Sequence, residues 1–251
     1  MKAILKIGFL TALLLAFAST AFADSITLLS AGGTGNFTNG TLQYLGTSPL
    51  NASFVANHYT ALVAGTIPSG SMASYDVSDA GVWTPAIFGS SWVSNTAASG
   101  ASCSGSQCDP NDFYYYQTTF TAAGGTALYN GSISVMADDT LEVLLNGTVI
   151  VPFAIVGGDG HCATGNTNGT NAMPSCGSVD TISLSGISLL PGANTLTVID
   201  AQTGLAGAGV DFTANLATPE PSSLLLLGTG LLGLAFVVFR RNKPSGLVAN
   251  S

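Results

Sequence analysis

Side chains that could carry out nucleophilic or acid–base chemistry are scarce in this sequence. A Ser-His-Asp arrangement needs a histidine held by an acid, and the only two histidines, His58 and His161, lie in no recognisable motif. Residues 24–218 contain no Lys or Arg, which excludes lysine nucleophiles, arginine clamps and lysine-containing phosphate loops from this segment. We therefore predict that the protein is not an enzyme.

A group of carboxylates offers the alternative to that prediction. Asp138, Asp139 and Glu142 lie close together in the sequence, and glycoside hydrolysis uses two carboxyl groups at a fixed separation. Acidic residues in turns also serve local hydrogen bonding, which is the competing interpretation. A glycan hydrolase that depends on Asp138 or Glu142 is the third of three functional hypotheses.

Acidic side chains could instead hold a metal ion. Several oxygen ligands without competing cations suit calcium, and the candidate ligands are Asp109, Asp112, Asp138 and Asp139. The spacing of an EF-hand loop is not present. We expect no cofactor apart from this candidate structural calcium ion.

Aromatic side chains could bind a sugar, and the candidates are Trp83, Trp92 and Tyr114. Core packing is the competing interpretation for both tryptophans. Strand alternation places Tyr115 on the face opposite Tyr114 and Tyr116, so at least one of these tyrosines should belong to the core. A carbohydrate-binding module, with or without calcium, is the second hypothesis.

The segment that positions these residues is rich in Gly, Ser, Thr and Asn, which disfavours helices. Short alternating runs recur between turn signals, and Asn146-Gly147 between two apolar runs predicts a type I′ hairpin. We predict an all-β fold, an antiparallel β-sandwich, for residues 24–218. Further short strands are expected within residues 41–64, including 53–55 and 58–63. The other expected strands are residues 25–30, 113–121, 132–137, 141–145, 148–151, 181–184, 187–190, 194–200 and 209–216.

Charge is divided unevenly along the chain. Residues 24–218 hold twelve of the thirteen acidic residues and have a formal charge of −12. This negative field disfavours nucleic acid as a partner and keeps a secreted domain soluble. All five basic residues lie near the chain ends, at Lys2, Lys6, Arg240, Arg241 and Lys243.

The first residues have the organisation of a secretory signal peptide. Lys2 and Lys6 form a positive start, an apolar run spans residues 7–18, and an Ala-Phe-Ala sequence ends at Ala23. We predict that the chain is cut after Ala23 and that the β-rich segment is exported.

A second apolar run, residues 222–239, precedes the basic residues at the other end of the chain. As a helix, these eighteen residues would extend about 27 Å, close to a hydrocarbon core of about 30 Å. The basic residues behind them should stay on the cytoplasmic side. We therefore expect a single C-terminal transmembrane helix, with a buried core helix as the alternative.

The order of Pro219-Glu220-Pro221, apolar run and Arg240-Arg241 resembles the PEP-CTERM sorting signal. In that family a membrane enzyme called exosortase is understood to cleave near the tripeptide and pass the ectodomain outward. The resemblance implies exosortase and, before processing, the inner membrane as partners. It also implies a final location at the cell surface or outside the cell, in a Gram-negative-type bacterium.

Four cysteines lie in the exported segment, where disulfides are the expected state. Of three connectivities we predict pairing of sequence neighbours, because each bridge would then close one Gly/Ser/Asn-rich loop. A metal site that uses His161 is the alternative, although the spacings match no zinc pattern. The predicted pairs are Cys103 with Cys108 and Cys162 with Cys176.

Motifs in the second half of this segment resemble a known type of ectodomain. They follow in order at residues 113–120, 137–139, 144–147 and 190–198. This order resembles the jelly-roll β-sandwich of many PEP-CTERM ectodomains and of galactose-binding-like modules. The resemblance implies a fold rather than a ligand, since the same sandwich serves adhesion, carbohydrate binding and plain structure.

The leading hypothesis is a non-enzymatic cell-surface or extracellular-matrix protein associated with exopolysaccharide. It rests on the two chain ends and on the lack of a reactive constellation in the sequence. The expected organisation is a signal peptide at 1–23, an ectodomain at 24–218, a sorting signal at 219–243 and a short tail at 244–251.

Overall fold

The computed structural model describes most of the predicted ectodomain and the helix that follows it. The chain divides into two compact units, one of Met1–Asp24 with Thr218–Ser251 and one of Ser25–Ala217. The predicted signal peptide and the predicted tail lie outside the described residues. Those residues are 24–50, 53–55, 58–60, 62–81, 83–99, 108–122, 128–153, 156–157, 176–203, 207–219 and 223–241.

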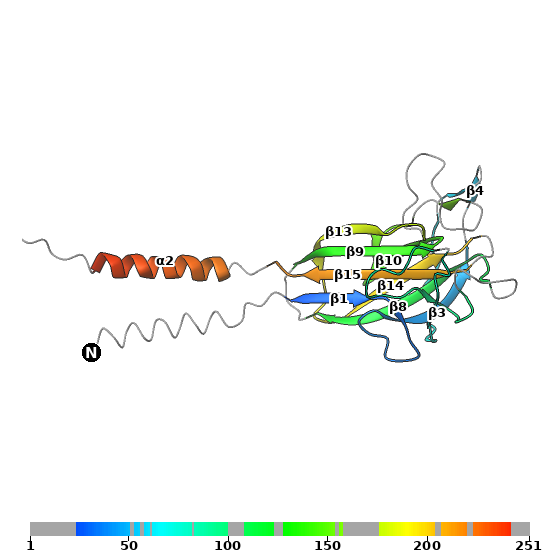
Figure 1. The fold of residues 1–251 in the computed structure, drawn as a ribbon, viewed down its shortest axis with the longest axis horizontal. Coiled ribbons are helices and arrows are strands. Elements are labelled where there is room, and N and C mark those ends of the chain that lie inside the picture. Colours follow the sequence, from blue (N-terminus) through cyan, green and yellow to red (C-terminus); the bar gives the residue numbers. More distant parts are fainter. Residues whose placement is uncertain are drawn as a thin grey trace, which may run out of the picture. The chain divides into compact units, whose positions relative to one another are not determined.

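Two six-stranded sheets form the unit Ser25–Ala217 (Figure 1). The first contains, in spatial order, β13 (Asp180–Ser188), β9 (Leu128–Asp138), β15 (Gly209–Ala217), β7 (Val93–Ser94) and β6 (Tyr75–Asp76), with β1 (Ser25–Leu29) also paired to β15. The second contains β11 (Thr148–Val151), β10 (Thr140–Leu145), β14 (Gly192–Ala201), β8 (Asp112–Ala122), β3 (Thr41–Pro49) and β2 (Ala31–Gly32).

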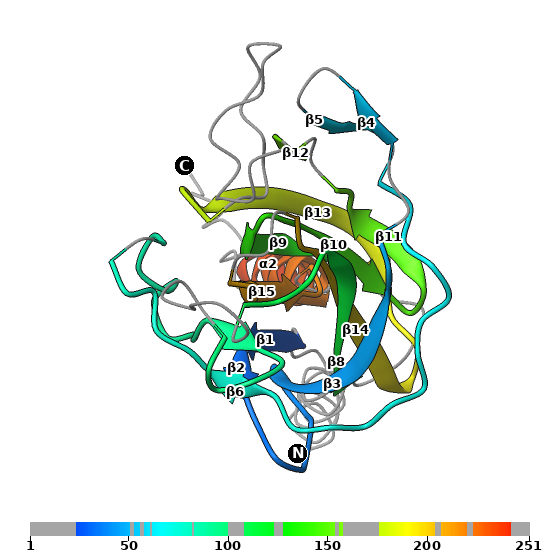
Figure 2. The same ribbon diagram turned by 90° about the vertical axis from the view of Figure 1, so that its right-hand side faces the viewer.

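Nearly all strand pairs are antiparallel, the described exception being β2 with β3. Figure 2 looks along the strands and separates the two layers. A further small sheet contains β4 (Ser53–Val55), β5 (His58–Thr60) and β12 (Val156–Gly157). The predicted antiparallel β-sandwich is therefore confirmed.

The main core lies between the two sheets. It contains inward side chains from both layers, such as Ile133 and Val135 of β9, Phe212 of β15 and Val198 of β14. Strand alternation sends every second side chain of each sheet into this space. With no Lys or Arg in residues 24–218, ion pairs of these residues contribute nothing to the stability of the unit, and apolar burial is its main source.

Strand β8 is buried on both faces. Tyr114 and Tyr116 join the main core, whereas Phe113 and Tyr115 join a second cluster on the outer face of the sheet. The Tyr115 hydroxyl donates to the Gly65 carbonyl at 3.3 Å, so the chain around Gly65 covers this outer face. The prediction that at least one of these tyrosines is core is confirmed.

The turn between β10 and β11 is the predicted hairpin. Asn146 and Gly147 have φ of 49° and 80°, as a type I′ turn requires. The Asn146 side chain donates to Asn194 Oδ1 at 2.8 Å and accepts from the Thr195 N–H at 2.9 Å. These bonds fix the turn to the start of β14.

Two strands differ from their predicted form. β3 is a single nine-residue strand where the sequence predicts only short strands, because Gly46 with φ of 125° and a register shift beside it interrupt the alternation. The predicted strands 181–184 and 187–190 are one strand, β13, with a register shift between Leu184 and Ile187. Gly186 takes up this shift with φ of 67°.

The chain crosses between the sheets at Asp138 and Asp139 instead of making a hairpin turn there. β9 belongs to the first sheet and β10 to the second, and the peptide bond between the two aspartates is cis. Both side chains are buried. The interpretation of these residues as acids of a hairpin turn is therefore wrong.

The helix α2 (Ser223–Arg241) occupies the second apolar run of the sequence. Within the part of the chain that the structure describes, no helix is both long and apolar enough to cross a membrane. In the other unit, Ser25 of β1 pairs with Ala217 of β15. The first and last strands of the sandwich therefore lie side by side.

Candidate functional site

Three acidic side chains are buried near one another where the chain crosses between the sheets. Asp138 ends β9, Asp139 follows it, and Asp200 of β14 lies directly opposite Leu141 of β10. Asp200 is 0 % exposed. The charge of Asp200 interacts with those of Asp138 and Asp139. We call Asp138, Asp139, Asp200 and the adjoining Gln202 the buried acidic cluster.

Neighbouring donors hold one oxygen on two of these carboxylates. Trp83 Nε1 donates to Asp138 Oδ2 at 2.8 Å. The Thr203 N–H donates to Asp139 Oδ2 at 2.8 Å, and the Thr203 hydroxyl donates to the same oxygen. These bonds fix the orientation of Asp138 and Asp139.

Other oxygens of the cluster have no hydrogen-bond partner among the described residues. They are Asp138 Oδ1, both carboxylate oxygens of Asp200 and Gln202 Oε1, although the Gly209 backbone lies close enough to Asp200 to offset part of the rise in its pKa. A buried polar atom without a partner costs about 1–3 kcal/mol. Each of these oxygens therefore needs a proton, a water molecule or a cation to account for it.

Burial raises the pKa of Asp138 and of Asp200 well above the ordinary value. Loss of solvation is the largest cause for both carboxyls. The neighbouring Asp139 raises the pKa of Asp138 further, and Asp138, Asp139 and Asp109 do the same for Asp200. Since residues 24–218 contain no Lys or Arg, electrostatics favours protonated carboxyls or a bound cation at this place.

The four predicted calcium ligands are divided by the structure. Asp138 and Asp139 lie in the buried acidic cluster. Asp109 is buried elsewhere and accepts hydrogen bonds from Asn95 Nδ2 at 2.9 Å and from a serine hydroxyl, while Asp112 is only partly buried at the start of β8. Among the described residues, no three His, Cys, Asp or Glu side chains are grouped so as to hold a metal ion.

Sequence reasoning missed two members of the cluster, Asp200 and Gln202. A signal for Asp200 was present, because it shares one strand face with Leu196 and Val198, which both lie in the core. An acid at such an inward position calls for a partner. Gln202 lies beyond the strand, and no local pattern marks it.

The two carboxylates of the hydrolase hypothesis do not face a common space. Leu141 and Val143 point into the main core, so Glu142 between them points to the opposite face of the sheet. Asp200 lies opposite Leu141 and therefore faces the main core, whereas Asp138 shares its strand face with Met136 and bonds Trp83. Burial raises the pKa of Glu142, but its side chain points to the outer face of the second sheet.

All three predicted sugar-binding aromatics are buried. The rings of Trp83 and Trp92 pack with centroids 4.5 Å apart, and Trp92, only 1 % exposed, donates from Nε1 to the Thr84 carbonyl at 2.9 Å. The Tyr114 hydroxyl donates to the Pro110 carbonyl at 3.0 Å. The geometry supports the core-packing interpretation, since none of these rings offers a face to a ligand.

Two of the four cysteines, Cys108 and Cys176, lie within the described residues, and neither is a free thiol. Cys176 is fully buried against the two tryptophans. Cys103 and Cys162 lie outside the described residues. The two predicted pairs therefore stay a prediction.

The predicted sorting tripeptide follows directly behind the sandwich. β15 ends at Ala217, Pro219 follows two residues later, and α2 begins at Ser223. Glu220 and Pro221 lie outside the described residues. All strands of the two large sheets precede the tripeptide.

Several solved structures show a weak likeness to this chain. A family 35 carbohydrate binding module from Clostridium thermocellum is 13 % identical, with 53 % of this chain and 82 % of that chain covered and a TM-score of 0.28. CBM35 from Paenibacillus barcinonensis is 17 % identical, with 58 % of this chain and 98 % of that chain covered and a TM-score of 0.22. The GH26-CBM35 β-(1,4)-mannanase of Podospora anserina is 18 % identical, with 59 % of this chain and 28 % of that chain covered and a TM-score of 0.28. TM-scores this low support no argument about fold or ligand.

A family match covers the C-terminal segment. The family described as PEP-CTERM protein-sorting motif matches residues 217–241, which include the Pro-Glu-Pro tripeptide, α2 and the two arginines. No curated protein matches the chain. The predicted sorting signal is confirmed, and the chain carries a PEP-CTERM protein-sorting motif at residues 217–241.

Proposed function

We propose that this chain is an exported, non-enzymatic cell-surface or extracellular-matrix protein that exosortase processes at its sorting motif. The observation that carries the proposal is the matched motif at residues 217–241, directly behind the last strand of the sandwich. Exosortase cuts near Pro219-Glu220-Pro221, and the ectodomain joins the exopolysaccharide layer of a Gram-negative-type bacterium.

Two features of the sequence give the route of the chain. The signal peptide at residues 1–23 directs export. The apolar run 222–239 then holds the chain in the inner membrane, and the basic residues behind it stay in the cytoplasm. The acidic segment without Lys or Arg is the part that crosses the inner membrane.

Cleavage at the tripeptide would leave the sandwich intact. The last strand, β15, ends at Ala217 and pairs with β1 from Ser25 onward. Every strand that the structure describes therefore lies before the cut. A released ectodomain keeps its core and both large sheets.

A binding or structural role fits the ectodomain better than catalysis does. Asp138 bonds Trp83 at the end of β9 in the first sheet, whereas Glu142 points to the outer face of the second sheet, and the segment lacks Lys and Arg. Convergent polar groups at an accessible surface are the usual mark of an active site. The buried acidic cluster lacks such access, because Asp138 and Asp200 are almost fully buried.

Mass spectrometry of the protein from medium and envelope fractions tests the sorting proposal. We expect mature chains that begin at Asp24 and end near Pro219. A variant with Pro219→Ala and Pro221→Ala should accumulate uncut in the inner membrane, whereas the control Pro191→Ala, in the exposed turn before β14, should be processed normally. Surface material that retains residues 222–251 throughout would show a plain tail anchor instead.

The unpaired oxygens of the buried acidic cluster favour a second candidate, a calcium-dependent carbohydrate-binding module. Calcium prefers carboxylate and amide oxygens, which are the atoms left unpaired on Asp138, Asp200 and Gln202. Binding requires these side chains to converge on the ion, since no three acidic groups among the described residues surround one point.

Thermal unfolding with calcium and with a chelator tests this second candidate. A ligand that binds only the folded state raises the Tm by mass action. We expect calcium to raise the Tm of the wild-type protein, Asp200→Asn to abolish the rise, and the control Asp180→Asn on the edge strand β13 to retain it. An unchanged wild-type Tm at millimolar calcium would remove calcium from the proposal.

A further inference from the structure

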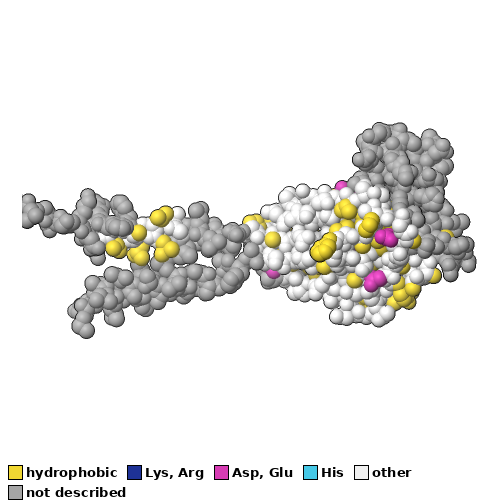
Figure 3. All heavy atoms as spheres, in the orientation of Figure 1, with side chains coloured by type: hydrophobic (Ala, Val, Ile, Leu, Met, Phe, Trp, Pro, Cys, Tyr) yellow, Lys and Arg dark blue, Asp and Glu magenta, His cyan; other side chains and the backbone are white. Residues whose placement is uncertain are grey.

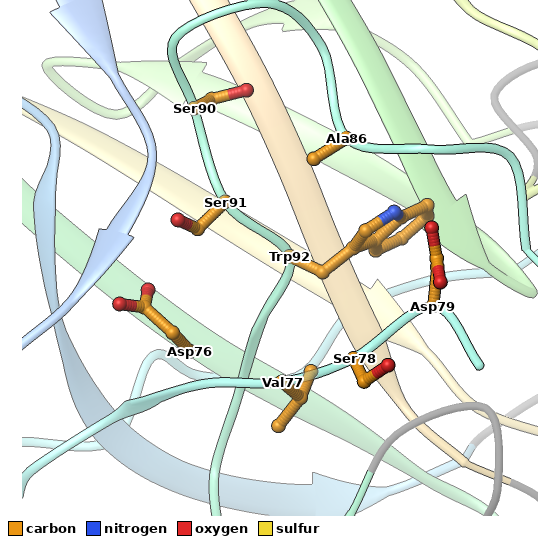
Figure 4. Close-up of a pocket in the computed structure, with 8 residues that line it drawn as sticks. All are labelled: Asp76, Val77, Ser78, Asp79, Ala86, Ser90, Ser91 and Trp92. Carbon is orange, nitrogen blue, oxygen red and sulfur yellow. The ribbon is translucent and has the colours of Figure 1, made fainter.

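A hollow lies on the outside of the sandwich, beside the buried tryptophans (Figure 4). Its volume is about 290 Å³, near the lower end of the range of about 300–1,000 Å³ for small-molecule sites. Residues 76–79, which start at the last residue of β6, form one wall, and Ala86 with residues 90–92, which lead into β7, form the other. Trp92 lies between the two walls.

Hydrogen bonds hold both walls in place. β6 and β7 pair with each other, and the Val77 N–H donates to the Trp92 carbonyl at 2.9 Å. The Ile87 N–H donates to Oδ2 of the buried Asp211 at 2.7 Å. The hollow is therefore formed before any ligand arrives, which lowers the entropy lost on binding.

A tight turn at one end of the hollow presents Phe88 to solvent. The Ser90 N–H donates to the Ile87 carbonyl at 2.9 Å, and Gly89 has φ of 89°, as the third position of a type II turn requires. Ala86 and Ser90 on either side of the turn line the hollow. Phe88 does not itself line the hollow, but it is 99 % exposed and lies two residues from both Ala86 and Ser90, so the turn that adjoins the hollow carries a whole exposed aromatic ring.

Polar groups on the opposite wall complete the site. One oxygen of Asp79 accepts from the Gly81 N–H at 3.1 Å, and Ser78 Oγ accepts from the Ala80 N–H at 3.0 Å. These bonds orient the side chains but, among the described residues, leave the second Asp79 oxygen and the Ser78 hydroxyl hydrogen for a ligand. In Figure 4 the Asp79 carboxylate stands beside the ring of Trp92.

We propose that this hollow, together with the exposed Phe88 of the adjoining turn, binds a neutral sugar unit of a polysaccharide. The apolar face of a sugar ring packs on Phe88, while sugar hydroxyls donate to Asp79 and accept from Ser78. The proposal rests on the second candidate function, carbohydrate binding, and moves it from the three buried aromatics to an accessible surface.

Charge favours a neutral ligand over an acidic polysaccharide. Residues 24–218 have a formal charge of −12 and no basic residue. Figure 3 shows acidic and hydrophobic side chains among neutral polar atoms on the described face of the sandwich, with no Lys or Arg among them. An anionic glycan would meet repulsion with no compensating ion pair.

Glycan-array screening followed by calorimetry on the exported protein tests the site, with neutral mannans, glucans and galactans as probes in calcium-containing buffer. We expect Phe88→Ala and Asp79→Asn each to raise the Kd, the former by roughly tenfold. Phe88→Tyr, which keeps the ring, should bind normally. Leu190→Ala removes another exposed apolar side chain, 54 % exposed in the turn before β14, and should also bind normally.

The outcomes separate the site from the function. If the wild type binds a neutral glycan and both Phe88→Ala and Asp79→Asn bind it equally well, the site is wrong and carbohydrate binding stands. If no glycan binds the wild type, the site and the second candidate function both fail, while the sorting proposal is judged by mass spectrometry. Binding only of acidic glycans, or of a lysine-rich peptide, would overturn the neutral-sugar assignment.

Discussion

Two regions of the ectodomain reverse the usual placement of side chains. The buried acidic cluster places Asp138 and Asp200 in the interior, whereas the turn beside the hollow places Phe88 in solvent with 99 % exposure. Both arrangements lower stability relative to the opposite placement. The unfavourable free energy of the two arrangements is reduced in different ways. A buried carboxyl can bind a proton or a cation, whereas an exposed ring can only be covered by a partner.

The two regions also differ in how they are built. Strands of both sheets enclose the buried acidic cluster, so any change there disturbs the packing between the layers. Phe88 is held by a turn that is anchored through backbone hydrogen bonds, and its ring contributes little to packing. Substitutions in the interior should therefore change the free energy of unfolding, and substitution of Phe88 should change ligand binding alone.

The largest effect is expected for Trp92→Ala. Trp92 is 1 % exposed, packs against Trp83 at 4.5 Å between ring centroids, and bonds the Thr84 carbonyl. Truncating a buried aromatic of this size costs about 3–5 kcal/mol. Urea unfolding followed by circular dichroism measures the loss, and a change below about 1 kcal/mol would show that this indole is not packed in solution.

A gain in stability is expected for Asp200→Asn in calcium-free buffer at pH 8. The substitution removes a carboxylate that has no partner for either oxygen among the described residues, and we expect a gain of roughly 1–3 kcal/mol. The control Asp180→Asn on β13 should change the free energy of unfolding little, because this side chain is partly exposed. A loss of stability in Asp200→Asn would mean that the native carboxylate has a stabilising partner.

The pH dependence of the wild-type protein in chelator should follow from the same carboxyls. Asp138 and Asp200 have raised pKa values in the folded state, so folding favours their protonated forms. The protonated carboxyls contribute fully to the free energy of unfolding below the ordinary Asp pKa of about 4. This contribution is lost as the pH rises toward the raised pKa values, by at most about 1.4 kcal/mol per pH unit for each group.

Unfolding curves between pH 4 and pH 8 measure how steeply the free energy of unfolding falls with pH. Asp200→Asn should make this fall less steep, because one of the two titrating groups is then gone. A wild-type protein that becomes more stable across this range without calcium would contradict the buried, unpaired state of Asp200.

The sequence predicted the sandwich because its strands carry local signals. Alternation marks β8 and β15, and Asn146-Gly147 marks the hairpin by its need for positive φ. β6 and β7 have two residues each, too few for any period to show. They exist because long-range bonds hold the adjoining loops, such as that from the Ile87 N–H to Asp211 Oδ2 at 2.7 Å, across 124 residues of sequence.

Site residues were harder to predict than strands for a related reason. Asp138 and Asp139 attract attention as a pair, but their burial depends on the crossing between sheets and not on a local turn. Trp83 and Trp92 are of a residue type that often binds sugars, yet tertiary packing buries both side chains. Phe88 resembles an ordinary core residue in the sequence, and only the path of the folded chain reveals that nothing covers it.

The smallest effect on stability is expected for Phe88→Ala, the exposed counterpart of Trp92→Ala. Substitution of an exposed side chain usually changes the free energy of unfolding by no more than about 0.5 kcal/mol. Urea unfolding of the variant should therefore overlay that of the wild type, so a weaker affinity for glycan could not be blamed on misfolding. A loss above about 1 kcal/mol would show that the ring packs against the protein in solution. A ring packed in this way would be part of the core and would have no free face for a sugar.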